Sequence, residues 1–137
     1  MIQRLRALAD WEETLVIPDL DFGRWAESMS DASGVIHMPW YQYSSVADAF
    51  IRSVNGAGWV QVFDWMAWAA TPAGQELLQD PARIGTANED DLSHLLTTII
   101  RSDRFNEGAI ASAFDRGLLL AIARRAKALL ATVGEDA

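Results

Sequence analysis

Cysteine is absent from this chain of 137 residues, and histidine occurs only twice. The lack of cysteine excludes disulfides, thiolate nucleophiles and every cysteine-ligated zinc or iron–sulfur site. The sequence also lacks a G-x-x-x-x-G-K phosphate loop, an H-E-x-x-H zinc motif and a G-x-S-x-G nucleophile elbow. It therefore predicts no catalytic residue, no metal and no cofactor.

Long apolar runs are missing as well. No stretch of about 18 apolar residues is present, and the first residues after Met1 lack the apolar core of a secretory signal. Half of the residues are hydrophobic and 22% are charged, a balance that lets one domain bury enough apolar surface to fold. We therefore expect a cytoplasmic protein without a membrane partner, with a single helical domain over residues 1–133 and a short frayed tail at 134–137.

Basic residues are scarce, with 11 Lys+Arg against 19 Asp+Glu and a net charge of −8. Residues 1–100 carry five basic and fourteen acidic groups, whereas residues 101–137 carry six and five. An acidic surface repels phosphate backbones, so the charge disfavours direct nucleic-acid binding and favours a basic protein partner. The plainer interpretation is that the acidity only keeps the protein soluble.

Hydrophobic residues recur at intervals of three and four through most of the chain, which predicts an all-α fold. We expect a compact bundle of six to eight helices. Residues 59–70 contain only Gln61 and Asp64 as polar side chains, so this segment is predicted to be the central helix. The clearest amphipathic stripe follows an N-cap at Asn88 and occupies residues 92–100.

Two segments near the N-terminus have weaker patterns. A short helix is predicted to begin after Asp19 or Asp21 and to include Phe22 and Trp25. Residues 35–43 have no helical stripe, contain a proline and are rich in aromatic and β-branched residues. They are predicted to form one irregular or extended aromatic segment.

One spacing resembles a metal site, because Asp91 and His94 lie three residues apart on a predicted helix. Carboxylate-bridged metal bundles need two such pairs and further glutamates, and only one pair is present. We therefore interpret Asp91 as a first-turn charge and His94 as a solvated side chain.

A first candidate site surrounds Asp64, whose carboxylate would need a cationic partner if it were buried among aromatic residues. Arg101 and Arg104 are the natural partners, and we predict a contact of Asp64 with one of them. The plain interpretation is an ion network that locks two helices together. The alternative is a small enzyme or ligand-binding domain, in which the arginines hold an anionic group and Asp103 or Glu107 does acid–base work. The complete candidate set is Asp64, Trp65, Trp68, Arg101, Asp103, Arg104 and Glu107.

A second candidate site is a partner-binding surface. Most of the six tryptophans belong in a core, but aromatic residues exposed on the extended segment would form a patch of the kind that dominates interface energetics. A cluster of acids at the start of the clearest helix would attract a basic partner. A homodimer that buries the aromatic segment against itself is a third alternative. The candidate residues are Trp40, Tyr41, Tyr43, Glu89, Asp90 and Asp91.

Two motifs in these clusters resemble those of an uncharacterised bacterial and phage-associated domain family. They are Phe63-Asp64-Trp65-x-x-Trp68 and Leu96-Thr97-x-x-x-Arg101-x-Asp103-Arg104-Phe105-x-Glu107-Gly108. The resemblance covers about residues 40–127. It implies a small helical domain in a prokaryotic protein, and it implies no activity, substrate or cofactor.

These patterns favour a small acidic binding protein that acts through a protein partner, since no nucleophile, metal cluster or phosphate loop is present. A narrower form of this hypothesis is an inhibitor of a host nucleic-acid-handling defence machine. Such a phage-type inhibitor would use its carboxylates to compete for a phosphate-binding channel. The alternative from another class is the small ligand-binding domain or enzyme with the tryptophan-lined pocket around Asp64.

Overall fold

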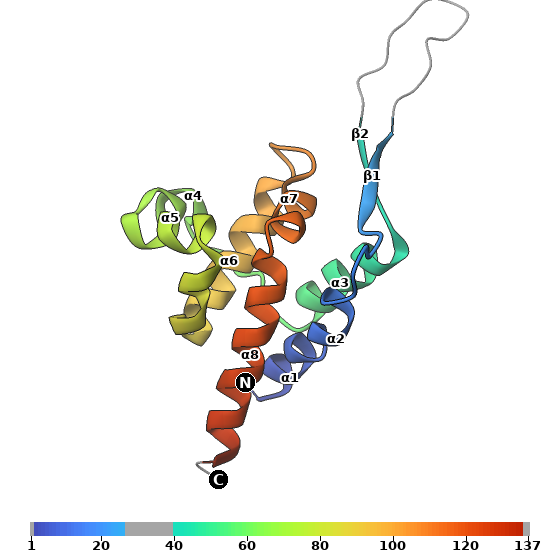
Figure 1. Cartoon of the computed structure of the whole chain (residues 1–137). Helices are drawn as coiled ribbons and strands as arrows, with labels where there is room; N and C mark the ends of the chain where they lie inside the picture. The colour runs from blue at the N-terminus through green and yellow to red at the C-terminus, as the bar shows by residue number, and fades with distance from the viewer. Residues whose placement is uncertain (1, 27–39, 136–137) are drawn as a thin grey trace, which may run out of the picture.

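The computed structural model describes residues 2–26 and 40–135, and it is mostly helical. These residues form eight α-helices, one 3₁₀-helix and one two-stranded sheet (Figure 1). The elements in chain order are α1 (Ile2–Ala9), α2 (Glu12–Leu15), β1 (Gly23–Ala26), β2 (Trp40–Tyr43), α3 (Ser45–Gly56), α4 (Trp65–Ala70), α5 (Pro72–Gln79), η1 (Pro81–Thr86), α6 (Glu89–Ser102), α7 (Ala109–Asp115) and α8 (Leu118–Glu135).

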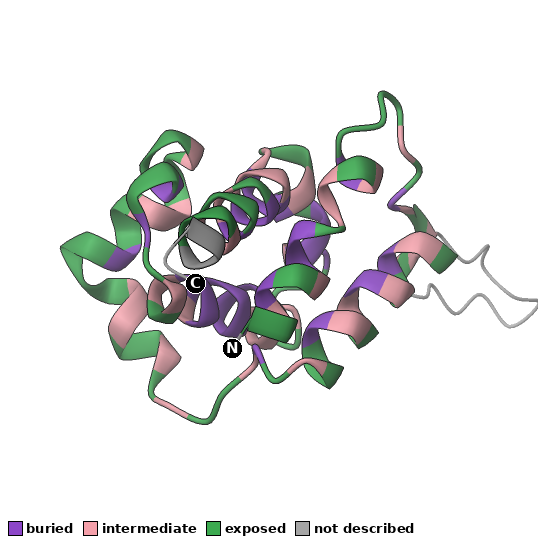
Figure 2. Cartoon of the chain, turned by 90° about the horizontal axis from the view of Figure 1, so that it is seen from below, coloured by how far each residue is buried: buried purple, intermediate pink, exposed green. Residues whose placement is uncertain are grey.

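Helices α6 and α8 provide most of the core. The hydrophobic stripe of α6 places seven of its 14 residues in the interior. The first three turns of α8 contribute a second row of fully buried side chains, and α1, η1 and α7 pack against this helix. Buried residues accordingly gather on the facing sides of the helices in the middle of the molecule (Figure 2). The buried residues of α8 are Leu118, Leu119, Ile122, Ala123 and Ala126.

The predicted central helix over residues 59–70 is not formed, and this prediction is wrong. Trp59 is buried, but residues 59–64 are irregular and α4 begins only at Trp65. No residue of α4 is buried, and Val62 is 98% exposed. Residues 60–70, which were predicted to lie in the centre, are therefore at least partly exposed, and only Trp59 is buried.

Hydrogen bonds to α6 explain this path. The Ser93 hydroxyl donates to the Trp59 carbonyl at 2.6 Å, and the Gln61 amide donates to the Thr97 hydroxyl at 3.0 Å. These bonds satisfy the backbone of an extended segment without a helix, and they also give two of the three buried polar residues of α6, Ser93 and Thr97, their partners. Asp64 then starts α4 as its N-cap by accepting from the Ala67 amide at 3.1 Å.

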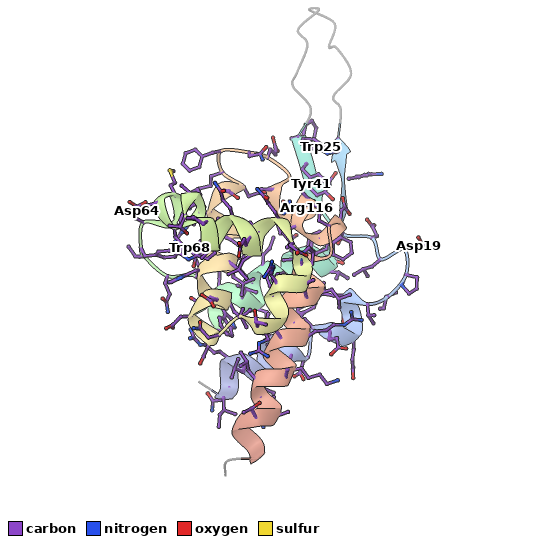
Figure 3. All side chains as sticks on the ribbon, turned by 60° about the vertical axis from the view of Figure 1, so that its left-hand side comes forward. Asp19, Trp25, Tyr41, Asp64, Trp68 and Arg116 are labelled. Atoms are coloured by element: carbon purple, nitrogen blue, oxygen red, sulfur yellow. The ribbon has the colours of Figure 1, made fainter. Side chains whose placement is uncertain are left out.

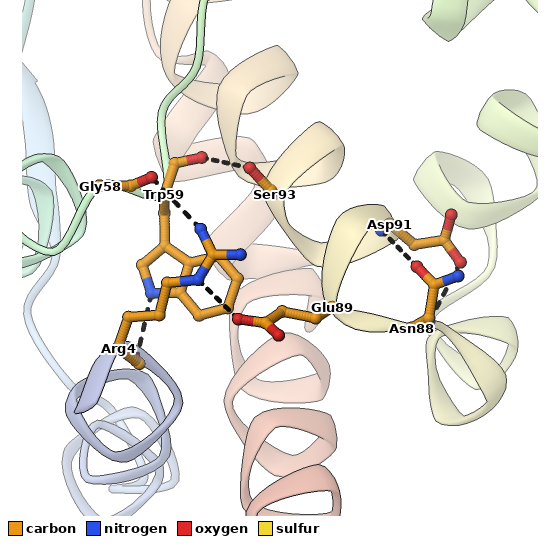
Figure 4. Close-up of polar contacts among 7 residues, drawn as sticks. All are labelled: Arg4, Gly58, Trp59, Asn88, Glu89, Asp91 and Ser93. Carbon is orange, nitrogen blue, oxygen red and sulfur yellow. Dashed lines mark hydrogen bonds and ion pairs between the residues drawn. The ribbon is translucent and has the colours of Figure 1, made fainter. Parts of the chain in front are cut away.

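Arg4 fixes Trp59 from the other side (Figure 4). Its guanidinium carbon lies 4.3 Å from the centroid of the Trp59 ring, and its backbone carbonyl accepts from the indole nitrogen at 3.2 Å. The Arg4 Nε also donates to Glu89 Oε1 at 2.6 Å, with side chains only 18% and 22% exposed. Partial burial makes this charge-assisted bond stronger than a surface ion pair. It joins α1 to the start of α6.

The helix predicted after Asp21 is also wrong, because residues 23–26 form β1 and pair in antiparallel register with β2. Trp25 lies opposite Tyr41 in this register. The extended character predicted for 35–43 is confirmed for 40–43, and residues 35–39 lie outside the described residues. Cross-strand aromatic pairing outweighs the weak helical spacing of β1.

Local signals mark the starts of three helices. The predicted N-cap at Asn88 is confirmed and begins α6 with a capping box, Ser44 caps α3 by accepting from the Ala47 amide, and Pro72 opens α5. Helix α8 continues to Glu135, so it includes the first two residues of the predicted tail, and the last two lie outside the description. In the part of the chain that the structure describes, no helix combines the length and apolarity needed to cross a bilayer.

Replacement of Trp59 tests the role given to this side chain. We expect Trp59→Ala to lower the free energy of unfolding by about 3–5 kcal/mol, because it removes a fully buried aromatic side chain and leaves a cavity. Val62→Ala is the matched control and should change stability by less than about 0.5 kcal/mol. Denaturant titration of both variants measures the difference, and similar costs for the two would contradict the assignment.

Candidate functional site

A cleft of about 560 Å³ opens between the β1–β2 hairpin and α7. We call it the hairpin cleft. The two strands, which carry Trp25 and Tyr41 (Figure 3), form one wall, and the turn from α6 to α7 together with α7 forms the other. Its lining includes aromatic and acidic side chains and one glycine, namely Asp21, Phe22, Trp25, Tyr41, Glu107, Gly108, Phe114 and Asp115.

A row of aromatic rings runs along this cleft from the core to the surface. Phe22 stacks on Phe114 with ring centroids 4.4 Å apart and meets Tyr43 edge-on at 6.0 Å. Tyr43 lies 4.7 Å from Tyr41, which meets Trp25 edge-on at 5.5 Å. Alternate strand residues share a face, so the register that pairs Trp25 with Tyr41 also aligns the row. Its inner end is buried, whereas Trp25 is 54% exposed.

Two glycines allow the rings to approach the backbone. A Cβ on Gly23, at φ +150°, would lie 2.6 Å from Tyr41 Cε1. A Cβ on Gly108, at φ +89°, would lie 2.9 Å from Trp25 Cζ2. Both positions therefore require glycine for conformation and for space. Gly108, the last residue of the second motif, seats the indole of Trp25 at the start of α7.

Two acids of the same motif hold the hairpin. Asp103 Oδ1 accepts from the Tyr43 hydroxyl at 2.6 Å and from the amides of Gly108 and Ile110 at 3.1 and 3.3 Å. Glu107 Oε1 accepts from the Tyr41 amide at 3.0 Å. Three hydrogen bonds to one oxygen hold the Asp103 carboxylate in place. Asp103 therefore acts as a positioning residue that joins β2, the turn and α7.

Acids outnumber bases in the lining of the cleft, where Asp21, Glu107 and Asp115 stand against Arg24. Burial raises the pKa of Tyr41 above its ordinary value, and the charges of Asp115 and Asp21 raise it further. The pKa of Tyr43 is also raised, first by burial and then by its hydrogen bond to Asp103. Asp21, Asp115 and Glu107 are all exposed, so three carboxylates surround the exposed end of the aromatic row.

The structure separates the residues predicted to form a pocket around Asp64. Asp64 and Trp68 lie on the α4 side of the molecule, away from Trp25 and Tyr41 (Figure 3). Among residues 2–26 and 40–135, Asp64 forms no ion pair with Arg101 or Arg104, and the predicted contact is wrong. The exposed carboxylate has an N-cap partner instead, so it does not need a cation.

The tryptophans of the first motif pack in two different places. The Trp65 ring lies 6.4 Å from that of Phe105, and the Trp68 ring lies 5.4 Å from that of His94. The His94 ring also lies 4.4 Å from that of Phe63, and its Nδ1 is buried without a hydrogen-bond partner among the residues that the structure describes. The interpretation of His94 as a solvated side chain is therefore wrong, because α4 and the segment before it cover the imidazole.

The predicted partner-binding residues also divide. Glu89 pairs with Arg4, and Asp91 accepts from the Asn88 amide in the capping box, whereas Asp90 is exposed. Trp40, on β2, is exposed. The acids at the start of α6 thus serve mainly the fold.

Tyr41 and Tyr43 from the second predicted set meet Asp103 and Glu107 from the first. The hairpin cleft therefore combines halves of two sites that were predicted separately. Sequence analysis missed Trp25 as a site residue, together with Asp21 and Asp115. The available signal was Gly23, a poor helix former that argued against the helix predicted there.

The fold and the cleft define a small, mostly helical domain with one aromatic hairpin packed beside a helix. The chain belongs to a family of unknown function (DUF6508), whose model matches residues 1–132. The N-terminal residues are part of this family, so the extent of 40–127 expected from the motifs is too short. Comparisons with curated proteins and with solved structures give no match.

Replacement of Asp103 tests its role as an anchor. Asp103→Ala should lower the free energy of unfolding by about 2–4 kcal/mol, because three donors lose a charged acceptor. The double variant Asp103→Ala/Tyr43→Phe should lose less stability than the sum of the losses in the two single variants. Arg104→Ala, at the exposed neighbouring position, serves as the control. Fully additive costs in denaturant titrations would show that the Tyr43–Asp103 bond contributes nothing.

The raised pKa of Tyr43 predicts a loss of stability at alkaline pH. A group whose pKa is higher in the folded state adds stability below its unfolded value, 10.0 for tyrosine, and this contribution is lost as the pH rises above it. The free energy of unfolding should therefore fall above that pH in the parent chain and less steeply in Tyr43→Phe. Parallel pH profiles from denaturant titration would contradict this assignment.

Proposed function

We propose that this protein is a binding module whose hairpin cleft accepts a basic segment of a partner protein. The observation that carries the proposal is the exposure of Trp25 in a cleft lined by three acids, Asp21, Asp115 and Glu107, and one base, Arg24. Tyrosine and tryptophan are the residues that most often dominate interface energetics. A half-exposed indole beside three carboxylates suits a ligand that is both cationic and able to lie against a ring.

A lysine or arginine side chain has these properties. A cation over an aromatic face contributes about 0.5–2 kcal/mol, depending on how far water is removed. The carboxylates add attraction that weakens with salt, and the overall charge of −8 steers a basic partner towards the protein. The aromatic row holds Trp25 and Tyr41 in place before binding, which reduces the entropy lost on association.

A pocket for a small organic cation is the second candidate. Its support is the cleft volume of about 560 Å³, which lies within the range of small-molecule sites. Acid–base catalysis receives less support, because Asp103 and Glu107, the two proposed catalytic acids, accept hydrogen bonds from the chain itself.

The narrower hypothesis of a phage or bacterial inhibitor of a nucleic-acid-handling machine stays a prediction. It relied on acidic clusters that would imitate a phosphate backbone. Glu12 lies 3.8 Å from Arg124 and 3.4 Å from Lys127, and Glu89 pairs with Arg4, so part of this charge is neutralised within the chain. The acids of the hairpin cleft support a basic partner more directly.

Peptide binding tests the proposal. Fluorescence anisotropy with arginine-rich peptides should show affinity that falls between about 50 and 200 mM salt. Asp21→Asn/Asp115→Asn should weaken binding by about tenfold or more and flatten the salt dependence. Glu13→Gln, which removes an exposed acid on α2, is the matched control and should leave affinity unchanged.

Equal binding by the cleft variant and the control would overturn the proposal, as would the absence of binding by any basic peptide. Competition by arginine amide at concentrations that match the peptide would instead favour the small-cation pocket.

A further inference from the structure

An exposed apolar patch lies on the other side of α7 from the hairpin cleft. It consists of Phe105 in the turn from α6 to α7 and Trp65 on α4, and the exposed Met66 follows Trp65 in the same helix. Phe105 is 75% exposed and Met66 is 56% exposed, and the rings of Trp65 and Phe105 face each other. Large apolar side chains exposed together indicate an interaction surface.

The fold does not account for Phe105. In the same turn, Asp103 and Glu107 bind the hairpin, and Gly108 seats Trp25. Phe105 makes no comparable contact with the core and presents most of its surface to solvent. Its hydrophobic surface is available to a ligand.

The patch and the hairpin cleft share a wall. A second cavity of about 370 Å³ opens between α4, α5, α6 and α7, and its lining includes Trp65 of the patch and Arg116 of the turn after α7. Asn106, Ala109 and Ser112 line both this cavity and the hairpin cleft. The N-terminal turn of α7 is therefore a low ridge between two depressions. Its small residues allow a peptide backbone to approach, and the exposed side chains of Asn106 and Ser112 offer it hydrogen-bonding groups.

We propose that the partner segment is an extended peptide that crosses this ridge, with a cationic side chain in the hairpin cleft and a large apolar side chain on the apolar patch. This inference rests on the proposed function and specifies its ligand. An α-helix with its side chains is about 10–12 Å wide, and an extended chain advances about 3.3 Å per residue. The cation and the apolar residue are therefore separated by about three or four residues.

Charge favours a basic peptide over a second copy of this chain. Two copies would each bring a net charge of −8, and their carboxylates around the cleft would repel each other. A basic segment brings the opposite sign to the cleft and an apolar group to the patch. One ligand then contacts the cleft on one side of the ridge and the patch on the other.

A series of synthetic peptides tests the proposed spacing. Each carries a fixed arginine pair and one phenylalanine, separated by one to seven glycine and serine residues, and a reference peptide has serine in place of phenylalanine. Affinity for the full chain should be highest at about three or four intervening residues. At this spacing it should exceed that of the reference peptide by about tenfold, because one aromatic side chain gains a buried contact.

Variants of the two halves should act differently. Phe105→Ser should remove the gain from phenylalanine and leave the affinity for the reference peptide unchanged. Asp21→Asn/Asp115→Asn should weaken the binding of every peptide. Ile17→Ser, which removes an exposed apolar residue at the end of α2, is the matched control and should change nothing.

An affinity that does not depend on spacing, or an unchanged optimum in Phe105→Ser, would overturn the inference that the peptide crosses the ridge. The proposed function would still stand in that case if the cleft variant weakened binding. A lack of binding by all peptides would overturn both. Sedimentation that shows a dimer of the parent chain and a monomer of Phe105→Ser would identify the patch as a self-interface, and that result would overturn this inference alone.

Discussion

The burial of Trp59 is the constraint on which the rest of the structure depends. Its carbonyl is fixed by Ser93 on α6, and its ring lies against the guanidinium of Arg4, which also pairs with Glu89 at the start of α6 (Figure 4). The backbone of Trp59 and Gln61 bonds to Ser93 and Thr97 on α6, and the chain therefore leaves the core as an extended segment. Helix α4 then forms at the surface, where Trp65 and Met66 remain partly exposed. The apolar patch thus follows from how Trp59 is buried.

The hairpin depends on a second anchor of the same kind. Two strands of four residues have little stability of their own, and three or more strands or packing against a helix is needed. Asp103 supplies this packing by binding the Tyr43 hydroxyl and the start of α7 with one oxygen. The aromatic row then extends from the core to Trp25. A rigid ring at the edge of an acidic cleft loses little freedom when it binds a cation.

The sequence predicts what is local and misses what is not. The stripe and capping box of α6, the Ser44 cap and Pro72 are short-range signals, and all three helices form where they indicate. Residues 59–70 are apolar on all sides, but composition cannot distinguish a buried helix from an extended segment whose backbone bonds to another helix. Asp64 carried the missed signal, because an acid before a short apolar run is typical of an N-cap. The strand at 23–26 depends on a partner whose residues begin at 40, and the candidate site joins Tyr43 to a carboxylate 60 positions away. Such pairings leave no periodic trace in one sequence.

The distribution of acids separates structure from function. Glu12, Glu89, Asp91 and Asp103 have cations, amides or hydroxyls as partners within the fold. Asp21 and Asp115 instead line the hairpin cleft, where burial raises the pKa of Tyr41 and their two charges raise it further. Like charges held together at such a position oppose folding, and a bound cation removes that opposition. A ligand that binds only the folded state adds its binding free energy to stability. A basic partner of the kind proposed would therefore stabilise the folded hairpin when it binds.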